Sequence, residues 1–182
     1  MSGRRQEILD AAMAIADENG LGGVSMRTVA EAVGVTPMAL YRHFDSKVAL
    51  LDGMVERLVT SLHPENVTGS WDERLTALAY AYRGLAQRHP WSADLLFSRP
   101  SATPDAARVT EFIYAAIREA GAPESQVGRL ERLVTTFVIG FAASEVLGRF
   151  ASRPLDFNAE FDADLADLRQ LIKATGDPLP RV

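Results

Sequence analysis

The chain has 182 residues, enough to bury a full hydrophobic core, and this length permits one domain or two. Its 47% hydrophobic and 24% charged residues are typical of a soluble globular protein. The absence of cysteine excludes disulfides, thiolate metal sites and a cysteine nucleophile, and it is consistent with a cytoplasmic protein.

Neither a signal peptide nor a membrane helix is expected. Charged residues are spread through residues 1–20, which lack the long apolar core of a signal peptide. The longest uncharged run, 133–144, is shorter than the ~20 residues that span a bilayer. We therefore read this run as a buried helix and expect no membrane association.

Every segment between the glycine and proline breaks has helical periodicity, and none alternates long enough to predict a strand. The first helix is expected at about 4–19, the second from 26 to its end at Gly34, the third from 37 onward and the fourth at about 45–62. Gly20 ends the first, Ser25 caps the second, and Thr36-Pro37 starts the third. The His63-Pro64 pair breaks the fourth.

Five more helices are expected at about 71–88, 91–97, 104–120, 123–151 and 158–174, separated by loops at 64–70, 99–104 and 152–157. The fold class is thus all-α with about nine helices. We divide the chain into an N-terminal three-helix DNA-binding domain, 1–46, and a C-terminal helical ligand-binding and dimerisation domain, 47–182.

Residues 25–47 have the layout of a helix-turn-helix, because two short helical patterns are joined at Gly34. Burying the apolar residues of this stretch against the first helix leaves a polar face at the front of the third. On that face Arg42 is suited to guanine O6 and N7, and Pro37 and Met38 to thymine methyls. Further contacts are predicted for Arg4, Arg5, Ser25, Arg27, Thr28, Thr36, Tyr41, His43 and Lys47, mostly to phosphates. An ordinary helical hairpin with a solvated polar face remains the alternative.

The net charge of −5 is unusual for a DNA-binding protein, and even residues 1–62 hold six Lys or Arg against eight Asp or Glu. Five of those six basic residues, however, lie in 1–6 and 25–47, where only Glu31 and Asp45 oppose them. A basic face on an acidic body favours specific over general duplex binding.

The run TVAEAVGVTPMALYRHFDSKVALL resembles the N-terminal domain of the TetR (tetracycline-repressor) family of bacterial transcription regulators. The resemblance covers about residues 4–52 and includes Ala30, Gly34, the Leu40-Tyr41-x-His43-Phe44 core, and Lys47. It implies a homodimer that binds an inverted-repeat operator and is released by a small ligand held among the fourth to eighth helices. It also assigns Tyr41, His43 and Lys47 to the DNA backbone. Met38 departs from the small residue common at its position, which puts the base preference in doubt.

Aromatic residues recur at helical spacing through the C-terminal region, and most of them are expected to pack in a helical core. The alternative is a pocket for an apolar or aromatic effector between helices. The positions predicted to line such a pocket are Tyr82, Trp91, Phe112, Phe137 and Phe141, with Glu145 as a polar anchor. Pairing with an arginine or exposure to solvent is the favoured alternative for Glu145.

Small residues repeat every four positions on the eighth helix, which places Gly140, Ser144 and Gly148 on one face. Such a row lets a second helix approach closely. The family resemblance makes it a candidate homodimer seam, together with Phe161, Leu165 and Leu168 of the ninth helix. Packing within one subunit explains the row equally well.

No enzyme, cofactor or metal is expected. The three histidines lie at no metal-ligand spacing, and no phosphate loop, nucleophile elbow or HExxH motif occurs. We therefore predict a ligand-responsive transcriptional regulator, and specifically a repressor. A constitutive DNA-binding protein without a ligand and a helical interaction module remain alternatives.

Overall fold

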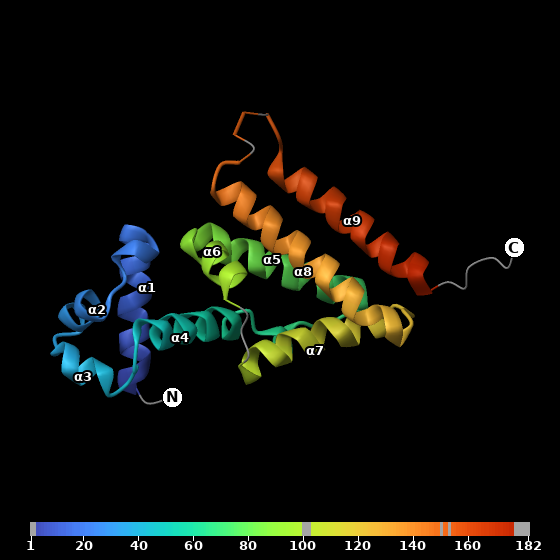
Figure 1. The fold of residues 1–182 in the computed structure, drawn as a ribbon. Helices are drawn as coiled ribbons and strands as arrows, with labels where there is room; N and C mark the ends of the chain where they lie inside the picture. Colours follow the sequence, from blue (N-terminus) through green and yellow to red (C-terminus); the bar gives the residue numbers. More distant parts are fainter. Residues whose placement is uncertain (1–2, 100–102, 150, 153, 177–182) are drawn as a thin grey trace, which may run out of the picture.

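The computed structural model describes residues 3–99, 103–149, 151–152 and 154–176. Within these ranges the fold is all-α with nine α-helices, which confirms the predicted class (Figure 1). The helices are α1 (Gly3–Gly23), α2 (Met26–Ala32), α3 (Pro37–Tyr41), α4 (Lys47–Thr60), α5 (Trp71–Arg88), α6 (Trp91–Ser98), α7 (Pro104–Glu119), α8 (Glu124–Val146) and α9 (Phe157–Gly176), and a 3-10 turn spans Pro64–Asn66.

Side-chain caps fix the helix starts in the N-terminal region. The Ser25 hydroxyl accepts a hydrogen bond from the Thr28 N–H at 3.1 Å, and the Thr36 hydroxyl accepts one from the Ala39 N–H at 3.2 Å. These caps confirm the predicted starts of α2 and α3. Ser46 caps α4 in the same way. The turn between α2 and α3 contains Gly34 at φ 68°, a left-handed conformation that glycine adopts without strain.

The ends of α1 and α8 differ most from the prediction. Gly20, at φ 66° and ψ 179°, interrupts α1 where its end was expected, but helical geometry resumes as far as Gly23. The predicted end of α8 at residue 151 is wrong, because the helix stops at Val146. Gly148 adopts φ 66°, and its N–H donates to the Glu145 carbonyl in a terminating turn. Gly148 therefore does not extend the small-residue row along α8.

The helices form two connected regions (Figure 1). Helices α1 to α3 pack together at one end, and α4 leads from them to the C-terminal helices. There α5 packs against α7 and α8, and α9 lies against α8. The short α6 contacts α1, α4 and α8, so it lies between the regions.

The hydrophobic core is continuous across the predicted domain boundary at residues 46 and 47, which coincides with the start of α4. Gly53 lies where α4 approaches Phe44 and Leu9 of the N-terminal region closely. A Cβ atom built on it would lie 2.8 Å from Phe44 Cε1 and 3.1 Å from Leu9 Cδ2. The absence of a side chain at Gly53 thus lets α4 pack directly on the three-helix region. A movement of α4 would therefore shift Phe44, which lies between α3 and α4.

Candidate DNA-binding face and ligand cavity

Helix α3 is anchored by its apolar side and exposes the opposite side. Leu40 and Phe44 are buried, whereas Met38 is 73% exposed. Tyr41 and Arg42 are also exposed. The predicted base-reading residues are therefore accessible on a helix whose position is fixed by the core, with Pro37 and Met38 at its start and Arg42 at its C-cap.

Two cations on this face are available to an outside ligand. Arg42, at the C-cap of α3, and Lys47, the first residue of α4, are exposed and form no ion pair with any described residue. Arg27 is also exposed, and its Nε lies 2.9 Å from Glu31 Oε1. Both partners of that pair are solvated, so the pair is weak and leaves Arg27 able to contact a phosphate.

Other predicted contact residues hold the N-terminal region together. Arg5 Nη1 donates to the His43 carbonyl at 2.8 Å, and its guanidinium lies 4.1 Å from the centre of the Phe44 ring. Arg4 pairs with Glu7 at 2.7 Å. The Thr28 hydroxyl accepts from the Ser25 N–H and donates to the Gly23 carbonyl, at 3.0 and 2.9 Å. Arg5 and Thr28 thus act first as positioning residues.

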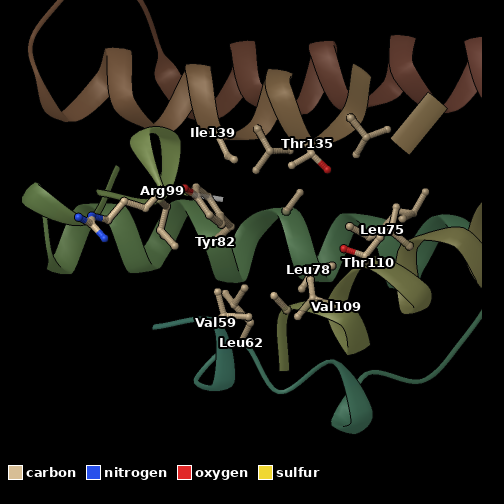
Figure 2. Close-up of a pocket in the computed structure, with 16 residues that line it drawn as sticks. Val59, Leu62, Leu75, Leu78, Tyr82, Arg99, Val109, Thr110, Thr135 and Ile139 are labelled. Atoms are coloured by element: carbon tan, nitrogen blue, oxygen red, sulfur yellow. The ribbon is translucent and has the colours of Figure 1, made fainter. Parts of the chain in front are cut away.

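A cavity of about 210 Å³ lies among the C-terminal helices. Helices α4 to α8 and the segment that follows α4 supply its walls (Figure 2). The lining is Val59, Leu62, Leu75, Leu78, Ala79, Tyr82, Leu96, Arg99, Ala106, Val109, Thr110, Ile113, Val134, Thr135, Val138 and Ile139. It is mainly aliphatic, as expected of a site for a small apolar molecule.

Of the six residues predicted to bind a ligand, only Tyr82 lines this cavity. Trp91 instead donates from Nε1 to Asp17 Oδ1 at 2.6 Å, which ties α6 to α1. Phe112 lies beneath the guanidinium of Arg74, 5.7 Å from it. Trp91 and Phe112 therefore stabilise helix packing and do not line the cavity.

Phe137 and Phe141 lie on the other side of α8. Their rings are 5.9 and 4.9 Å from the ring of Phe161 on α9. They line a separate hollow of about 520 Å³ between α8 and α9. The residues of α8 that face the 210 Å³ cavity include Val134 and Val138 instead. The aromatic residues therefore mark the α8–α9 contact, while aliphatic residues mark the cavity.

Glu145 pairs with a buried arginine and does not reach the cavity. Its two carboxylate oxygens accept from Nε and Nη2 of Arg83, both at 2.7 Å, and Arg83 is only 3% exposed. Arg83 Nη1 also donates to Asn158 Oδ1 at 3.0 Å. The Arg83 hydrogen bonds hold the pKa of Glu145 below its ordinary value. Arg83, Glu145 and Asn158 thereby join α5, α8 and α9.

The predicted seam residues divide into two groups. Phe161 is 0% exposed and Leu165 is also buried within the subunit, so the prediction that they face a partner is wrong. The physical reason is that α9 folds its apolar stripe onto α5 and α8. Gly140 and Ser144 remain partly accessible and Leu168 is half-buried, while Leu133, Leu147 and Leu171 are exposed.

Sequence reasoning missed the aliphatic liners of the cavity, and no local signal marks them. Leu75 and Leu78 have the spacing of ordinary core residues, and only the tertiary arrangement leaves space beside them. None of the described helices is long and apolar enough to cross a membrane. Among the described residues, no group of three or more His, Asp or Glu side chains is arranged to hold a metal ion.

An exposed helix-turn-helix joined by α4 to a helical domain with an internal apolar cavity places the chain in the class of helix-turn-helix proteins. Two family models match the chain. The model for bacterial regulatory proteins of the tetR family matches residues 8–54, and the model for the tetracyclin repressor-like C-terminal domain matches residues 63–168. The chain belongs to the tetR family of bacterial regulatory proteins, which confirms the resemblance noted in its N-terminal region.

Individual relatives agree with this assignment. The chain is 33% identical over 172 residues to the HTH-type transcriptional repressor DrrR1 of Streptomyces coeruleorubidus, covering 93% of this chain and 64% of that protein. It thus spans less than two thirds of that repressor, and 62% of a second relative, a regulator of Saccharopolyspora erythraea.

Solved structures share the fold along nearly the whole chain. BioQ of Mycobacterium smegmatis has a TM-score of 0.79 at 26% identity, covering 94% of this chain and 99% of that chain. BioQ with its double-stranded DNA operator gives a TM-score of 0.76, again at 26% identity, covering 93% and 98%. ActR of Streptomyces coelicolor in complex with (S)-DNPA gives 0.81 at 20% identity, covering 95% and 98%, which shows a common fold.

Proposed function

We propose that the protein is a transcriptional repressor that binds an inverted-repeat operator as a homodimer and is released by a small apolar effector. The observation that carries this proposal is the position of α4. Its first turn adjoins the exposed face of α3, and Val59 near its end lines the apolar cavity. One helix thus belongs to both the DNA-binding face and the ligand site.

The DNA-binding roles follow from exposure. Arg42 forms a bidentate contact with guanine, and Met38 and Pro37 meet thymine methyl groups in the major groove. Tyr41 and Lys47 contact phosphates, which set the register of the protein on the duplex. BioQ, which shares this fold, was solved with its double-stranded DNA operator, and this supports operator binding by the present chain.

The homodimer seam is formed by the accessible side of α8 and α9. Gly140 and Ser144 allow a second helix to approach closely, and the exposed Leu133 and Leu147 lie at either end of this row. Leu171 adds an exposed apolar side chain on α9. A two-fold axis here presents two copies of α3 to an inverted repeat.

Release by the effector is a population shift. The ligand binds better to a conformation in which the recognition helices no longer match major grooves ~34 Å apart. Two contacts hold α4 against the cavity walls: Asp52 pairs with Arg99 after α6, and the Thr60 hydroxyl donates to Asp105 of α7 at 2.5 Å. A ligand that separates these helices changes the tilt of α4. The cavity disfavours the alternative of a constitutive binder with a filled core.

The first test is retention of genomic DNA fragments by the purified full chain over a salt series with competitor DNA. We expect a few fragments that share an inverted repeat, and we expect Arg42→Ala to lose that selectivity. Arg129→Ala on α8, an exposed arginine bonded to Gln126, is the matched control. Retention that is independent of sequence and vanishes with rising salt would refute the proposal.

A further inference from the structure

The polar groups of the ligand cavity are few and specific. Beside the aliphatic liners, the described residues of the wall include only Tyr82, Arg99, Thr110 and Thr135. The hydroxyl oxygen of Tyr82 is buried without a hydrogen-bond partner among the described residues, and burial raises its pKa, so it stays a neutral phenol. Since this oxygen is inaccessible, Tyr82 offers a ligand mainly its ring.

Arg99 is the one charged residue among the described residues of that lining, and its charge is already balanced. Its guanidinium pairs with Asp52 of α4. Figure 2 shows the guanidinium at one end of the lining, directed away from the other labelled side chains. A ligand carboxylate inside the cavity would therefore lose its hydration without gaining an unpaired cation, which is strongly unfavourable.

Thr135 presents a hydrogen-bond acceptor to the cavity. Its hydroxyl donates to Glu131 Oε1 at 2.9 Å, one turn earlier on α8. A carboxylate only accepts, so the single hydroxyl proton of Thr135 is committed to it, and the remaining lone pairs of Oγ1 are free to accept. Figure 2 shows this oxygen pointing from α8 into the space between the helices.

Thr110 of α7 lies on the opposite wall and can both donate and accept (Figure 2). The Thr110 hydroxyl forms no hydrogen bond to any other described residue. A group that both donates and accepts, such as an alcohol or phenol, satisfies Thr135 and Thr110 better than an ether or a ketone does.

We propose that the effector of this cavity is an uncharged organic molecule with an apolar body and a hydroxyl group that donates a hydrogen bond to Thr135 Oγ1. This inference rests on the proposed function, since it names the chemistry of the ligand that the cavity takes. The apolar walls supply affinity by burying the body of the ligand. The threonine pair fixes its orientation.

Three naphthalene probes with the same ring system test the proposal: 2-naphthol, 2-methoxynaphthalene and 2-naphthoate. Binding to the full chain is measured by equilibrium dialysis at neutral pH. We expect 2-naphthol to bind about fivefold more tightly than 2-methoxynaphthalene, the worth of one net hydrogen bond. We expect 2-naphthoate to bind at least about 100-fold more weakly than 2-naphthol.

Thr135→Val removes the hydroxyl while keeping the side-chain shape. It should abolish the preference for 2-naphthol and leave the affinity for 2-methoxynaphthalene unchanged, which also shows that the cavity is intact. Thr175→Val is the matched control, because the Thr175 hydroxyl bonds to the Leu171 carbonyl on α9. This control should keep the wild-type preference.

Three results would overturn the inference: naphthoate binding as tight as that of 2-naphthol, a preference that survives Thr135→Val, or no binding of any probe. The genomic retention assay on the same preparations separates this failure from that of the proposed function. Selective DNA retention with any of these results leaves the regulator and refutes only the ligand class. Loss of selective retention refutes the regulator, whatever the probes do.

Discussion

The buried Arg83–Glu145 pair is the most sharply testable contact in the C-terminal region. Glu145→Ala removes a carboxylate that accepts two hydrogen bonds from Arg83, each 2.7 Å long, and a third from Gln87 Nε2 at 3.1 Å. It leaves the guanidinium of Arg83, which is 3% exposed, without its counter-charge. The neighbours that remain include Asn158 Oδ1 at 3.0 Å, the rings of Phe161 and Phe141 at 4.9 and 5.6 Å, and the charge of Asp162.

Breaking one partner of a buried ion pair costs about 3–5 kcal/mol. Because Asn158 and Phe161 still contact the guanidinium, we expect the lower end, about 3 kcal/mol of unfolding free energy. This corresponds to about a 150-fold fall in the folding equilibrium. For a chain of this size it lowers the melting temperature by about 6–12 °C.

The assay is thermal and urea unfolding followed by circular dichroism, at one protein concentration because the proposed dimerisation would add to the apparent stability. The double variant Arg83→Met/Glu145→Leu should regain most of the loss, since it leaves no unpaired buried charge. Glu111→Gln, in an exposed pair with Arg118, should leave the melting temperature unchanged. A melting temperature of Glu145→Ala within about 2 °C of wild type would refute the reasoning.

The same pair predicts a pH dependence. The pKa of Glu145 is lowered from 4.5 because Arg83 hydrogen-bonds to the ionised form. A carboxyl group whose pKa is depressed by folding contributes stability above its unfolded pKa and loses it as pH falls through its folded pKa. The gap in melting temperature between wild type and Glu145→Gln should therefore be constant above pH 4.5 and narrow below it. A gap that stays constant in more acidic buffer would contradict the assignment.

Three further predictions concern other parts of the molecule. Gly53→Ala places a Cβ atom 2.8 Å from Phe44 Cε1. Because this overpacking outweighs the gain in helix propensity, we expect a net loss of about 1 kcal/mol in the free energy of unfolding. A higher urea midpoint than that of the wild type would contradict this expectation. Leu147→Glu, at a leucine that is 72% exposed, should weaken the dimer in light-scattering measurements, whereas Phe97→Glu on α6 should not. Lys47→Ala should weaken binding to all DNA duplexes alike and reduce the slope of log affinity against log salt concentration by about one. If the variant instead loses only its selectivity between sequences, Lys47 contacts a base and not a phosphate.

Local chemistry made the N-terminal region predictable from the sequence. The caps at Ser25 and Thr36 and the turn at Gly34 each depend on a few adjacent residues, and the structure has all three. The same applies to the exposed face of α3, because burying Leu40 and Phe44 leaves the opposite side of the helix to solvent. The contact roles assigned to that face stay predictions.

The C-terminal region was less predictable, because several helices share the same apolar periodicity. A stripe on α8 shows which residues are buried but not which neighbouring helix covers them. Phe137 and Phe141 therefore suggested a ligand pocket, although they pack toward α9. For Glu145 the sequence left three environments open, and the choice depended on Arg83, 62 positions away.

The sequence by itself determined the helix count, the helix-turn-helix and the family resemblance, since these follow from periodicity, capping and a contiguous motif. Only the tertiary structure decided where the apolar cavity lies, which leucines remain exposed and which threonines line that cavity. Those features depend on how helices pack across long sequence separations, and on the space left where their side chains do not meet.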